Sequence, residues 1–563
     1  MGKTIIVGGV AAGASCAARL RRLKENEEII LLERGEYISY ANCGLPYHVG
    51  KVIGNREDLL VMKKPMMENR FHIDVRNNSE VTSINRDKQR VSIREVNGKE
   101  YEESYDNLVI ATGSSPLKPR IEGMESQRVK TLWTVPDTDE IKSFIQEQNA
   151  KKAVVVGGGF IGLEMAENLQ FLGMDVTIVE AANQIMAPLD YELALLLNEN
   201  IRKNGVKLIL NNGVSRFEDK TDGIDVVLSD EKVVSADLVI LAIGVRPNSE
   251  LARDAGLELN ERGGIVVNEN MQTSDPYIYA AGDVVEVEDF VLGEKTMVPL
   301  AGPANKQGRI VADNIAGIPS KYAGTQGSSV VKVFDLNAAA TGVNEKTLIK
   351  KGWVKNKDYR SLLITQNSHA GYYPGATPIY VKLLFSMDGN EIYGGAVVGR
   401  DGVDKRIDTL GVALRLHASV FDLTNLELSY APPFSSAKDP VNMAGYVAEN
   451  MINGFVEIAE WNELDVNENA VILDVREKPE LTMFAFQKGV NIPLSELRNR
   501  YEELDKQKEY VIFCAIGVRA YNAYKILKEK GFTNIKIYPA GTRFYMSTHV
   551  KEEEVSKEFI CKF

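Results

Sequence analysis

The sequence of 563 residues predicts an α/β protein, and two features support that prediction. One is a strand, a small-residue turn, a helix and a strand in succession at the N-terminus, and the other is a repeat of that order further along the chain. Because this length exceeds what a single hydrophobic core usually supports, we expect three or four domains. The hydrophobic fraction of 44% and the charged fraction of 26% are typical of a soluble globular protein.

The first unit begins with an apolar run over 3–7 that predicts a strand. A helix over 14–24 and a second strand over 29–32, which ends at Glu33, complete the unit. Small residues in the turn before the helix let a pyrophosphate approach the helix N-terminus, and the carboxylate can accept ribose hydroxyls. The turn departs from G-x-G-x-x-G only in its middle glycine position, which Val10 occupies. The sequence therefore predicts a dinucleotide-binding unit.

The second unit contains the complete motif, with Gly157, Gly159 and Gly162 in its three glycine positions. A strand precedes the motif, and a helix and a second strand that ends at Glu180 follow it. A single G-x-G-x-x-G motif is weak, but in this context and used twice it is a strong indication of two bound dinucleotides. No arginine follows Glu180 in the next three residues to receive a 2′-phosphate, which favours NADH over NADPH.

Charge and cysteine content exclude several classes of protein. The net charge of -12 argues against a general nucleic-acid or anionic-membrane surface. The N-terminus leads directly into a strand without a signal peptide, and apolar runs stay below the roughly 18 residues that a membrane span needs. The four cysteines are far apart and fit no metal-binding spacing, so we expect no metal and a reducing cytoplasm; they are Cys16, Cys43, Cys514 and Cys561.

Cys43 lies in a turn-rich segment, 39–47, just after the first unit. Asn, Gly and Pro around it indicate an irregular backbone rather than a core strand, although a lone cysteine is more often inert packing. No second cysteine lies within several residues, so a redox role would require a mixed disulfide with a small thiol.

Two later stretches, 108–116 and 279–283, each consist of a strand that runs into a small-residue turn. Their order resembles the flavin-contacting motifs of flavoprotein reductases with two dinucleotide domains. This resemblance implies FAD on the first unit and NADH on the second, and two Rossmann-like domains at 1–147 with 269–324 and at 148–268. The FAD contacts it implies are Gly8, Ala11, Ala12, Gly13, Glu33, Arg34, Asn42, Val81, Ala111, Thr112, Gly113, Gly282 and Asp283. The NADH contacts it implies are Gly157, Gly159, Phe160, Ile161, Gly162, Glu180 and Gly244.

The S-Y-x-N-C-G-L-P-Y sequence around Cys43 resembles coenzyme A disulfide reductases and the related NADH oxidases and peroxidases, which keep one redox cysteine. The resemblance implies an α+β dimerisation domain at 325–447 that completes the active site of the partner in a homodimer. It assigns a role at the sulfur to Tyr430 and to Tyr372 or Tyr373, with Tyr372 favoured. A phenol can donate a proton to a leaving thiolate, although these tyrosines could instead only pack the dimer interface.

The same resemblance implies contacts to coenzyme A from basic and polar residues. Any one basic residue of the first helix could equally belong to a solvated face. Arg19 differs from the usual residue of the family at its position. The implied coenzyme A contacts are Ser15, Arg19, Arg22, Ser39, Asn42, Asn305 and Lys438.

The last part of the chain, 455–563, predicts a separate α/β domain. A buried-type strand delivers Cys514 to a loop that contains Gly517 and Arg519, and a helix follows. Backbone N–H groups and a helix N-terminus can stabilise a thiolate or persulfide anion there. The loop resembles a rhodanese domain, with Cys514 at the persulfide-carrying position, and Asp474 with Arg476 matches the D-x-R motif of that family. Cys561 lies in a charged tail and is interpreted as incidental.

These features predict an NADH-dependent, FAD-containing reductase of coenzyme A persulfide, coenzyme A disulfide or polysulfide. Cys43 would attack the substrate, and Cys514 would bring or receive the sulfane sulfur. The fused sulfur-transfer domain favours persulfide over disulfide. Three alternatives stay open: an NADH oxidase or peroxidase, a sulfurtransferase alone, and a non-catalytic redox sensor.

Overall fold

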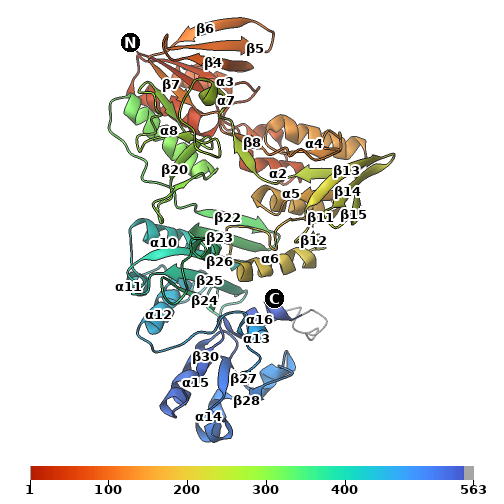
Figure 1. Ribbon diagram of the computed structural model, residues 1–563, viewed down its shortest axis with the longest axis vertical. Helices are drawn as coiled ribbons and strands as arrows, with labels where there is room; N and C mark the ends of the chain where they lie inside the picture. Colours follow the sequence, from red (N-terminus) through yellow and green to blue (C-terminus); the bar gives the residue numbers. More distant parts are fainter. Residues whose placement is uncertain (1, 551–563) are drawn as a thin grey trace. The chain divides into compact units, whose positions relative to one another are not determined.

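The computed structural model describes residues 2–550, and the chain divides into two compact units (Figure 1). The first unit comprises Met1–Asn183 and Gly205–Gly327, and the second comprises Gln184–Asn204 and Ser328–Phe563. Within residues 2–550, no helix is both long enough and apolar enough to cross a membrane.

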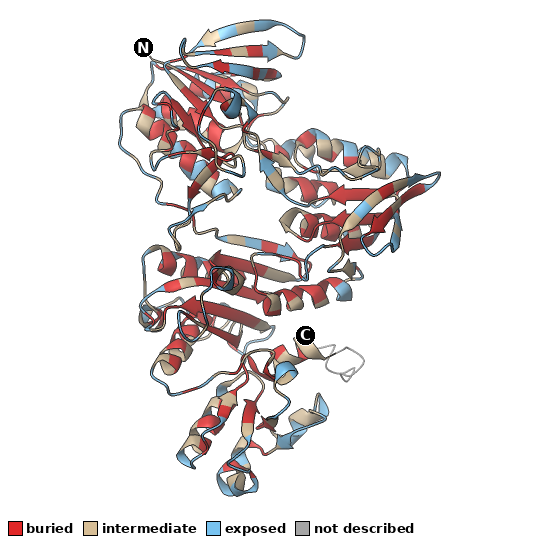
Figure 2. Cartoon of the chain, viewed as in Figure 1, coloured by how far each residue is buried: buried red, intermediate tan, exposed pale blue. Residues whose placement is uncertain are grey.

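The first unit contains a five-stranded parallel sheet in the order β19-β7-β1-β2-β3. Helices α1 (Ala11–Leu23) and α8 (Ala301–Ile315) pack on each other, so closely that a Cβ at Gly308 would lie 2.2 Å from the carbonyl oxygen of Ala12. The strands of the sheet are almost completely buried, as parallel strands covered on both faces must be (Figure 2). Their bounds are β1 Lys3–Val7, β2 Glu28–Leu32, β3 Asp74–Arg76, β7 Asn107–Ile110 and β19 Ile278–Ala280.

The same unit contains a second five-stranded parallel sheet in the order β12-β11-β10-β16-β9. Helix α5 (Phe160–Phe171) follows its central strand, and helix α4 (Val135–Glu147) begins at a capping box formed by Thr134 and Asp137. The strands are β9 Val129–Lys130, β10 Lys152–Val156, β11 Asp175–Val179, β12 Lys207–Ile209 and β16 Leu238–Leu241.

Smaller elements complete the first unit. Two antiparallel three-stranded sheets are formed by β4 Ser79–Asn85, β5 Arg90–Glu95 and β6 Glu100–Ser104, and by β13 Val214–Lys220, β14 Gly223–Leu228 and β15 Val233–Ala236. The remaining strands are β8 Ser114–Pro116, β17 Val245–Pro247, β18 Ile265–Val266, β20 Val285–Glu288 and β21 Lys295–Thr296. The remaining helices are α2 Leu45–Val49, α3 Lys64–Phe71 and α7 Glu250–Asp254.

The second unit is built on an antiparallel five-stranded sheet in the order β22-β23-β26-β25-β24. Its strands are β22 Ser329–Val333, β23 Leu336–Gly342, β24 Arg360–Asn367, β25 Pro378–Phe385 and β26 Ile392–Gly399. The helices around it are α6 Tyr191–Lys203, α9 Glu345–Lys350, α10 Val403–Arg415, α11 Val420–Asn425 and α12 Pro440–Ile452.

A four-stranded parallel sheet in the order β28-β27-β29-β30 forms the C-terminal part of the second unit. Its buried apolar residues and those of the antiparallel sheet belong to one continuous core. The strands are β27 Ala470–Asp474, β28 Val490–Asn491, β29 Glu509–Phe513 and β30 Ile535–Ile537. The helices are α13 Glu463–Val466, α14 Leu494–Arg500, α15 Val518–Glu529 and α16 Gly541–His549.

The predicted α/β class, with two dinucleotide-binding folds and a C-terminal α/β domain, is confirmed. The first helix begins at Ala11, earlier than the predicted 14–24, because the small residues of the turn already adopt helical conformation. The domain boundaries given above stay a prediction. One feature that they did not include is the segment Gln184–Asn204, which clusters with the second unit although the strands on either side of it belong to the first.

Candidate active site

The turn after β1 is shaped by two glycines that admit no side chain. Gly8 has φ of +101°, and a Cβ on it would lie 2.2 Å from the carbonyl oxygen of Ala111. A Cβ on Gly13 would lie 1.9 Å from the carbonyl oxygen of Gly8, so α1 can approach the turn only at a glycine. The carboxylate of Glu33 accepts hydrogen bonds from the N–H of Gly9 at 2.8 Å and of Gly35 at 2.7 Å, and thereby fixes the turn.

The turn after β10 repeats this geometry. A Cβ on Gly157 would lie 2.3 Å from the carbonyl oxygen of Ala242, and one on Gly162 would lie 2.0 Å from that of Gly157. The carboxylate of Glu180 accepts from the N–H of Gly158 at 2.7 Å and from Ala182. Both turns therefore form the close-packed cradle that a dinucleotide pyrophosphate requires at a helix N-terminus.

The middle position of the motif differs between the two turns without a change in their packing. Gly159 is the N-cap of α5, and no atom lies within 4 Å of a Cβ built on it. Val10 is the N-cap of α1 in the first turn. A side chain can therefore occupy this position, which is why the first turn keeps its shape without the middle glycine.

Asp283 lies beside the first cradle, directly after Gly282, which has φ of +89°. Its carboxylate accepts a hydrogen bond from Ser114 Oγ at 2.8 Å, and burial raises its pKa. The preceding glycine is held by a hydrogen bond of 2.8 Å from its N–H to the side-chain oxygen of Gln307. Asn248 ties the Ala111–Ser115 segment together, because its side chain and backbone bond to Thr112, Gly113 and Ser115.

Cys43 is exposed and sits in the 3-10 turn Asn42–Gly44, directly before α2. Cys43 therefore lies outside a core strand, as predicted, but its segment is helical rather than irregular, because the 3-10 turn leads directly into α2. The side-chain amide of Asn42 lies 3.4 Å from the carbonyl oxygen of Trp133. Partial desolvation and the nearby carboxylates of Glu164 and Asp283 raise the pKa of the Cys43 thiol.

Glu164 is a residue of this site that the sequence reasoning missed. It lies on α5, the helix of the second cradle, and its carboxylate accepts a hydrogen bond from the Tyr47 hydroxyl at 3.2 Å. Tyr47 belongs to α2, which packs on α5, so Glu164 connects the helix of the second cradle to the Cys43 segment. Burial raises the pKa of Glu164 to about 7. The signal in the sequence was a carboxylate in the first turns of the predicted helix, two residues after the last glycine of the motif.

The remaining predicted cofactor residues lie on several elements of the first unit. Val81 is in the core on β4, and the side chain of Arg34 is exposed beside Glu33. Gly244 has φ of +115° and its carbonyl accepts from Leu117. The first turns of α1 and α5 contain Ala11, Ala12, Phe160 and Ile161.

The predicted coenzyme A residues of the first unit divide into two groups. Ser15 donates to Asn305 at 2.5 Å, and Ser39, with φ of +44°, donates its N–H to the Gly9 carbonyl of the first turn. Arg19 instead pairs with Asp313 at 2.8 Å. Arg22 is exposed, and its guanidinium lies 5.1 Å from the centre of the Phe71 ring.

The second unit brings the two predicted tyrosines together. The hydroxyls of Tyr372 and Tyr430 lie 2.6 Å apart, and both side chains are exposed. Their hydrogen bond raises the pKa of Tyr372. Tyr373 contacts the ring of His369 instead. A cavity of about 570 Å³ adjoins the pair and is lined by Tyr430, Phe434, Lys405 and His369.

Lys438 lies on the same segment as Tyr430. Its side chain is exposed and is the neighbour of Asp439, which caps α12 and binds the buried Arg406 at 2.9 Å. The cap fixes the backbone from which Lys438 projects into solvent.

The Cys514 loop has the geometry of an anion cradle. The Cys514 side chain is only 1% exposed, and the N–H of Gly517 lies 3.1 Å from its sulfur. Gly517 has φ of +109° and caps α15, so the helix N-terminus faces the sulfur. The carbonyl oxygens of Cys514 and Ala515 accept hydrogen bonds from Thr542 and Arg543, the first residues of α16.

Two arginines of this domain are paired with carboxylates. Arg476 binds Asp474 at 2.7 Å, and both side chains are buried. Arg519 binds Glu480 through both terminal nitrogens, at 2.5 and 2.7 Å.

The other cysteines differ from these two. Cys16 is completely buried in α1, and burial raises its pKa to about 12, so its thiol is inert packing. The predicted incidental residue, Cys561, lies outside the described residues.

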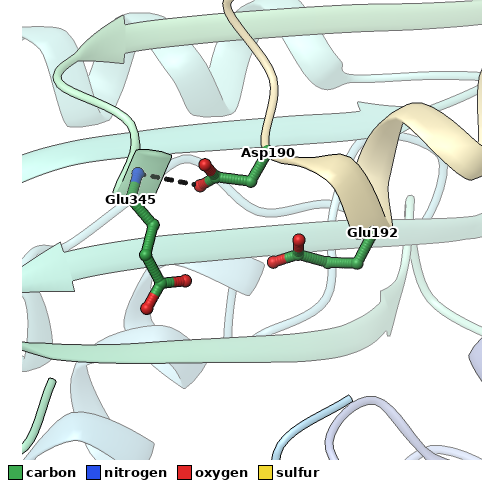
Figure 3. Close-up of side chains that lie close together, drawn as sticks. All are labelled: Asp190, Glu192 and Glu345. Atoms are coloured by element: carbon green, nitrogen blue, oxygen red, sulfur yellow. Dashed lines mark hydrogen bonds between the residues drawn. The ribbon is translucent and has the colours of Figure 1, made fainter. Parts of the chain in front are cut away.

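Three carboxylates of the second unit lie close together away from these sulfurs: Asp190, Glu192 and Glu345 (Figure 3). The buried ammonium of Lys382 binds Asp190 at 2.9 Å and Glu345 at 2.5 Å and also contacts Glu192. These neighbours raise the pKa of Lys382 well above its usual value. The cation of this cluster is therefore a lysine of the chain itself.

Comparison with known proteins places these sites in a family. The pyridine nucleotide-disulphide oxidoreductase family matches residues 2–308. The chain belongs to this family. The dimerisation domain of the same family matches residues 328–440, and a rhodanese-like domain matches residues 459–546.

Named relatives agree with the family assignment. The coenzyme A disulfide reductase of Staphylococcus epidermidis is 37% identical over 451 residues, which are 80% of this chain and 100% of the relative. The structure of reduced Bacillus anthracis CoADR-RHD has a TM-score of 0.94 and 49% identity, and the match covers 98% of this chain and 99% of that one. An NAD-dependent persulfide reductase from A. fulgidus has a TM-score of 0.91 and 39% identity, with 96% and 100% covered.

This pyridine nucleotide-disulphide oxidoreductase is therefore an NAD(P)H-dependent flavoprotein enzyme that acts on sulfur. FAD and a pyridine nucleotide fit its two glycine cradles, because the close packing of strand, turn and helix in each cradle leaves a helix N-terminus available to the pyrophosphate. The rhodanese-like domain that the C-terminal sequence predicts is also confirmed.

Proposed function

We propose that the protein reduces coenzyme A persulfide, with coenzyme A disulfide or polysulfide as related substrates, at the expense of NADH. The main support for this proposal is that one chain contains two cysteine sites with different surroundings. Cys43 is exposed beside the FAD cradle, and Cys514 is enclosed in a loop that directs an N–H and a helix N-terminus at its sulfur.

The chain provides a defined place for each cofactor. FAD would lie on the cradle of Gly8 and Gly13, with Glu33 near its ribose and Asp283 beside it. When bound, FAD accepts a hydride from NADH and makes two electrons available beside Cys43. The cradle of Gly157 would hold NADH, and the Glu180 carboxylate would repel the 2′-phosphate of NADPH, which supports NADH as the donor.

Cys43 would act as the nucleophile. Its thiolate attacks the outer sulfur of a persulfide, a new bond forms between the two sulfurs, and coenzyme A leaves as a thiolate. Two electrons then break the Cys43 sulfur–sulfur bond and release hydrosulfide. With a disulfide substrate the same attack gives a mixed disulfide, and the electrons release a second thiol.

Tyr372 and Tyr430 would supply the proton for the leaving thiolate. Their hydroxyls lie 2.6 Å apart on an exposed surface, so one phenol can donate to the substrate while the other stabilises it. Exposed tyrosines and Phe434 on a family dimerisation domain support a homodimer in which this surface meets the partner's Cys43. Coenzyme A would contact Ser15, Ser39, Asn42, Asn305, Arg19, Arg22 and Lys438.

Cys514 would carry sulfane sulfur as a persulfide. The N–H of Gly517 and the start of α15 stabilise the persulfide anion. The covalent connection to the reductase domains raises the local concentration of this persulfide for the reductase. Lys355 of the antiparallel-sheet domain pairs with Glu460 at 2.6 Å, which helps to hold the rhodanese-like domain in place.

Anaerobic NADH oxidation with coenzyme A persulfide tests the proposal in the wild type, Cys43→Ser and Cys514→Ser. We expect Cys43→Ser to abolish turnover and Cys514→Ser to lower it, with coenzyme A disulfide reduced more slowly than the persulfide. Substitution at Cys16, a buried thiol, as Cys16→Ala provides the matched control with unchanged turnover. A Cys43→Ser variant that still reduces persulfide would contradict the proposal.

An NADH oxidase is the second candidate. A water-forming NADH oxidase from Lactobacillus brevis has a TM-score of 0.76 and 27% identity, and the match covers 81% of this chain and 99% of that one. Turnover that requires air and ignores both sulfur substrates would favour this candidate.

A further inference from the structure

The Cys514 loop lies beside a cation whose charge is already neutralised. Arg519 follows the loop in the first turn of α15, and its guanidinium binds both carboxylate oxygens of Glu480. Both side chains remain about one-third exposed, at 30% and 33%, so a molecule that approaches the loop meets the pair. The hydrogen bonds to Glu480 are the main cause that raises the pKa of Arg519, and Cys514 adds to the rise.

Glu480 is held in this position from a second direction. Its carboxylate also accepts a hydrogen bond of 3.0 Å from the backbone N–H of Glu477, which closes the capping box of the 3-10 turn Lys478–Thr482. The guanidinium beside it lowers the pKa of Glu480, so the residue is ionised at neutral pH. The pair is therefore a fixed feature of the site and not a contact between two mobile side chains.

The two neighbouring arginines are bonded to other groups, Arg476 to a carboxylate and Arg543 to a neutral amide oxygen. Arg476 is bound to Asp474 and to the carbonyl oxygen of Phe484. Arg543 donates its backbone N–H to Ala515, and its guanidinium lies 3.4 Å from the side-chain oxygen of Asn367 on β24. The anion-stabilising groups aimed at the sulfur are thus the N–H of Gly517 and the N-terminus of α15.

Sulfane-sulfur donors differ in the charge that they bring to such a loop. Thiosulfate is a dianion, and its leaving group, sulfite, carries two charges away from the attacked sulfur. An alkyl persulfide brings at most one charge at its reactive end, and its leaving group is a thiolate. A free arginine beside the sulfur would favour the dianion, whereas a paired arginine with an ionised carboxylate disfavours it.

We propose that Glu480 is a specificity-determining residue of the Cys514 site, which by pairing with Arg519 selects alkyl persulfides over thiosulfate as sulfur donors. This inference rests on the proposed role of Cys514 as a sulfur carrier and names the class of donor that it accepts.

The transfer balances with either donor. The Cys514 thiolate attacks the sulfane sulfur, the bond from that sulfur to the donor breaks, and the electron pair leaves with sulfite or with the alkyl thiolate. Cys514 then carries a persulfide anion. In the assay, cyanide attacks the outer sulfur, thiocyanate leaves, and the Cys514 thiolate returns. Since no electrons enter or leave, neither NADH nor FAD is required for this half-reaction.

The test compares thiocyanate formation from thiosulfate and from glutathione persulfide in the full-length protein and in Glu480→Gln. The glutamine keeps an oxygen that can accept from Glu477 while it removes the negative charge. We expect the rate with thiosulfate to rise about tenfold, because an unpaired guanidinium attracts the dianion. The rate with glutathione persulfide changes less than twofold, so the donor preference shifts toward thiosulfate.

Three further variants separate charge from structure. Glu480→Asp keeps the charge and alters the geometry, so it does not gain activity with thiosulfate. The double variant Glu480→Gln with Arg519→Gln loses the gain, because the gain depends on the freed guanidinium. Glu496→Gln removes a carboxylate that pairs with Arg500 on α14, and it leaves both rates unchanged.

The outcomes distinguish this inference from the proposed function. If Glu480→Gln transfers sulfur from glutathione persulfide but gains nothing with thiosulfate, selection by Glu480 is wrong and the sulfur-carrier role stands. An equal gain in Glu480→Asp likewise overturns it. If the wild type transfers sulfur from neither donor, or Cys514→Ser does so at the wild-type rate, the sulfur-carrier role itself is wrong.

Discussion

At the scale of single residues, the environment of Cys43 opposes the thiolate that the proposed reaction needs. Desolvation and the carboxylates of Glu164 and Asp283 raise the pKa of its thiol. The pKa of Glu164 is raised to about 7, so its charge appears only as the pH passes through neutrality. Glu164 therefore controls how readily the neighbouring sulfur ionises, and it does so in the physiological pH range.

Replacement of Glu164 by glutamine makes Cys43 more reactive. Above pH 7 the wild-type carboxylate is ionised and disfavours the thiolate, whereas the glutamine is neutral. We expect iodoacetamide to alkylate Cys43 about three- to tenfold faster in Glu164→Gln at pH 8, as read by peptide mass spectrometry. Below pH 6 the wild-type carboxyl is protonated, so the two proteins react alike. Glu140→Gln on the surface of α4 is the control, and an equal rate for Glu164→Gln at pH 8 would refute the electrostatic role.

The tyrosine pair allows a comparison of two adjacent residues. Tyr372 is bonded to Tyr430, whereas Tyr373 packs against His369. We expect Tyr372→Phe and Tyr430→Phe each to lower kcat for persulfide reduction about 10- to 100-fold, because a proton donor for the leaving thiolate is lost. Tyr373→Phe retains most of the wild-type kcat. A larger loss in Tyr373→Phe than in Tyr372→Phe would reverse this assignment.

At the scale of elements, the cluster around Lys382 fastens helix α6 to the antiparallel sheet. Asp190 caps α6, Glu192 lies in its first turn, and Lys382 comes from β25. Glu345, from the start of α9, accepts from the same ammonium. This buried network explains why the segment Gln184–Asn204 clusters with the second unit.

Removal of this lysine leaves three carboxylates without their cation. We expect Lys382→Met to lower the free energy of unfolding by about 3–5 kcal/mol, measured by urea denaturation at pH 7. Lys350→Met, at an exposed position of α9, is the control and changes stability by less than about 0.5 kcal/mol. If Lys382→Met lowers the free energy of unfolding no more than the control does, the network makes no net contribution to stability.

The same network predicts how the free energy of unfolding falls at acid pH. Lys382 and Lys355 outweigh the burial of Glu345 and lower its pKa to about 2. A carboxyl group whose pKa is lower in the folded protein than in the unfolded chain stabilises the fold. That stabilisation is complete above the pKa of the unfolded chain, about 4.3, and is lost as the pH falls through the pKa of the folded protein. The contribution of Glu345 therefore fades between about pH 4 and pH 2.

The glycine cradles could be predicted from the sequence because each is marked by a short motif that directly follows a strand, with Gly8 and Gly13 in one copy and Gly157 and Gly162 in the other. No such motif marks the contacts that only the fold creates. The contacts of Glu164 and Glu480 could not be predicted in this way. Their partners, Tyr47 and Arg519, lie 117 and 39 residues away, and only the fold brings them together.

At the scale of the whole molecule, the chain joins a pyridine nucleotide-disulphide oxidoreductase to a rhodanese-like domain. The rhodanese-like domain shares a core with the antiparallel sheet, and Thr365 on β24 donates to the carbonyl oxygen of Ala540 at 2.8 Å. Ala540 directly precedes α16, whose first residues bond to the Cys514 loop. The loop is thus fixed to the dimerisation domain that also carries Tyr372 and Tyr430, which supports a common function for the two sulfur sites.

The stoichiometry of the complete reaction tests the central proposal most directly. NADH is mixed anaerobically with coenzyme A persulfide and the holoenzyme, and hydrogen sulfide and coenzyme A are quantified against NADH consumed. A reductase yields one hydrogen sulfide and one coenzyme A for each NADH, and Cys43→Ser yields neither. NADH consumption that begins only when air is admitted, without release of hydrogen sulfide, would contradict persulfide reduction and identify an oxidase.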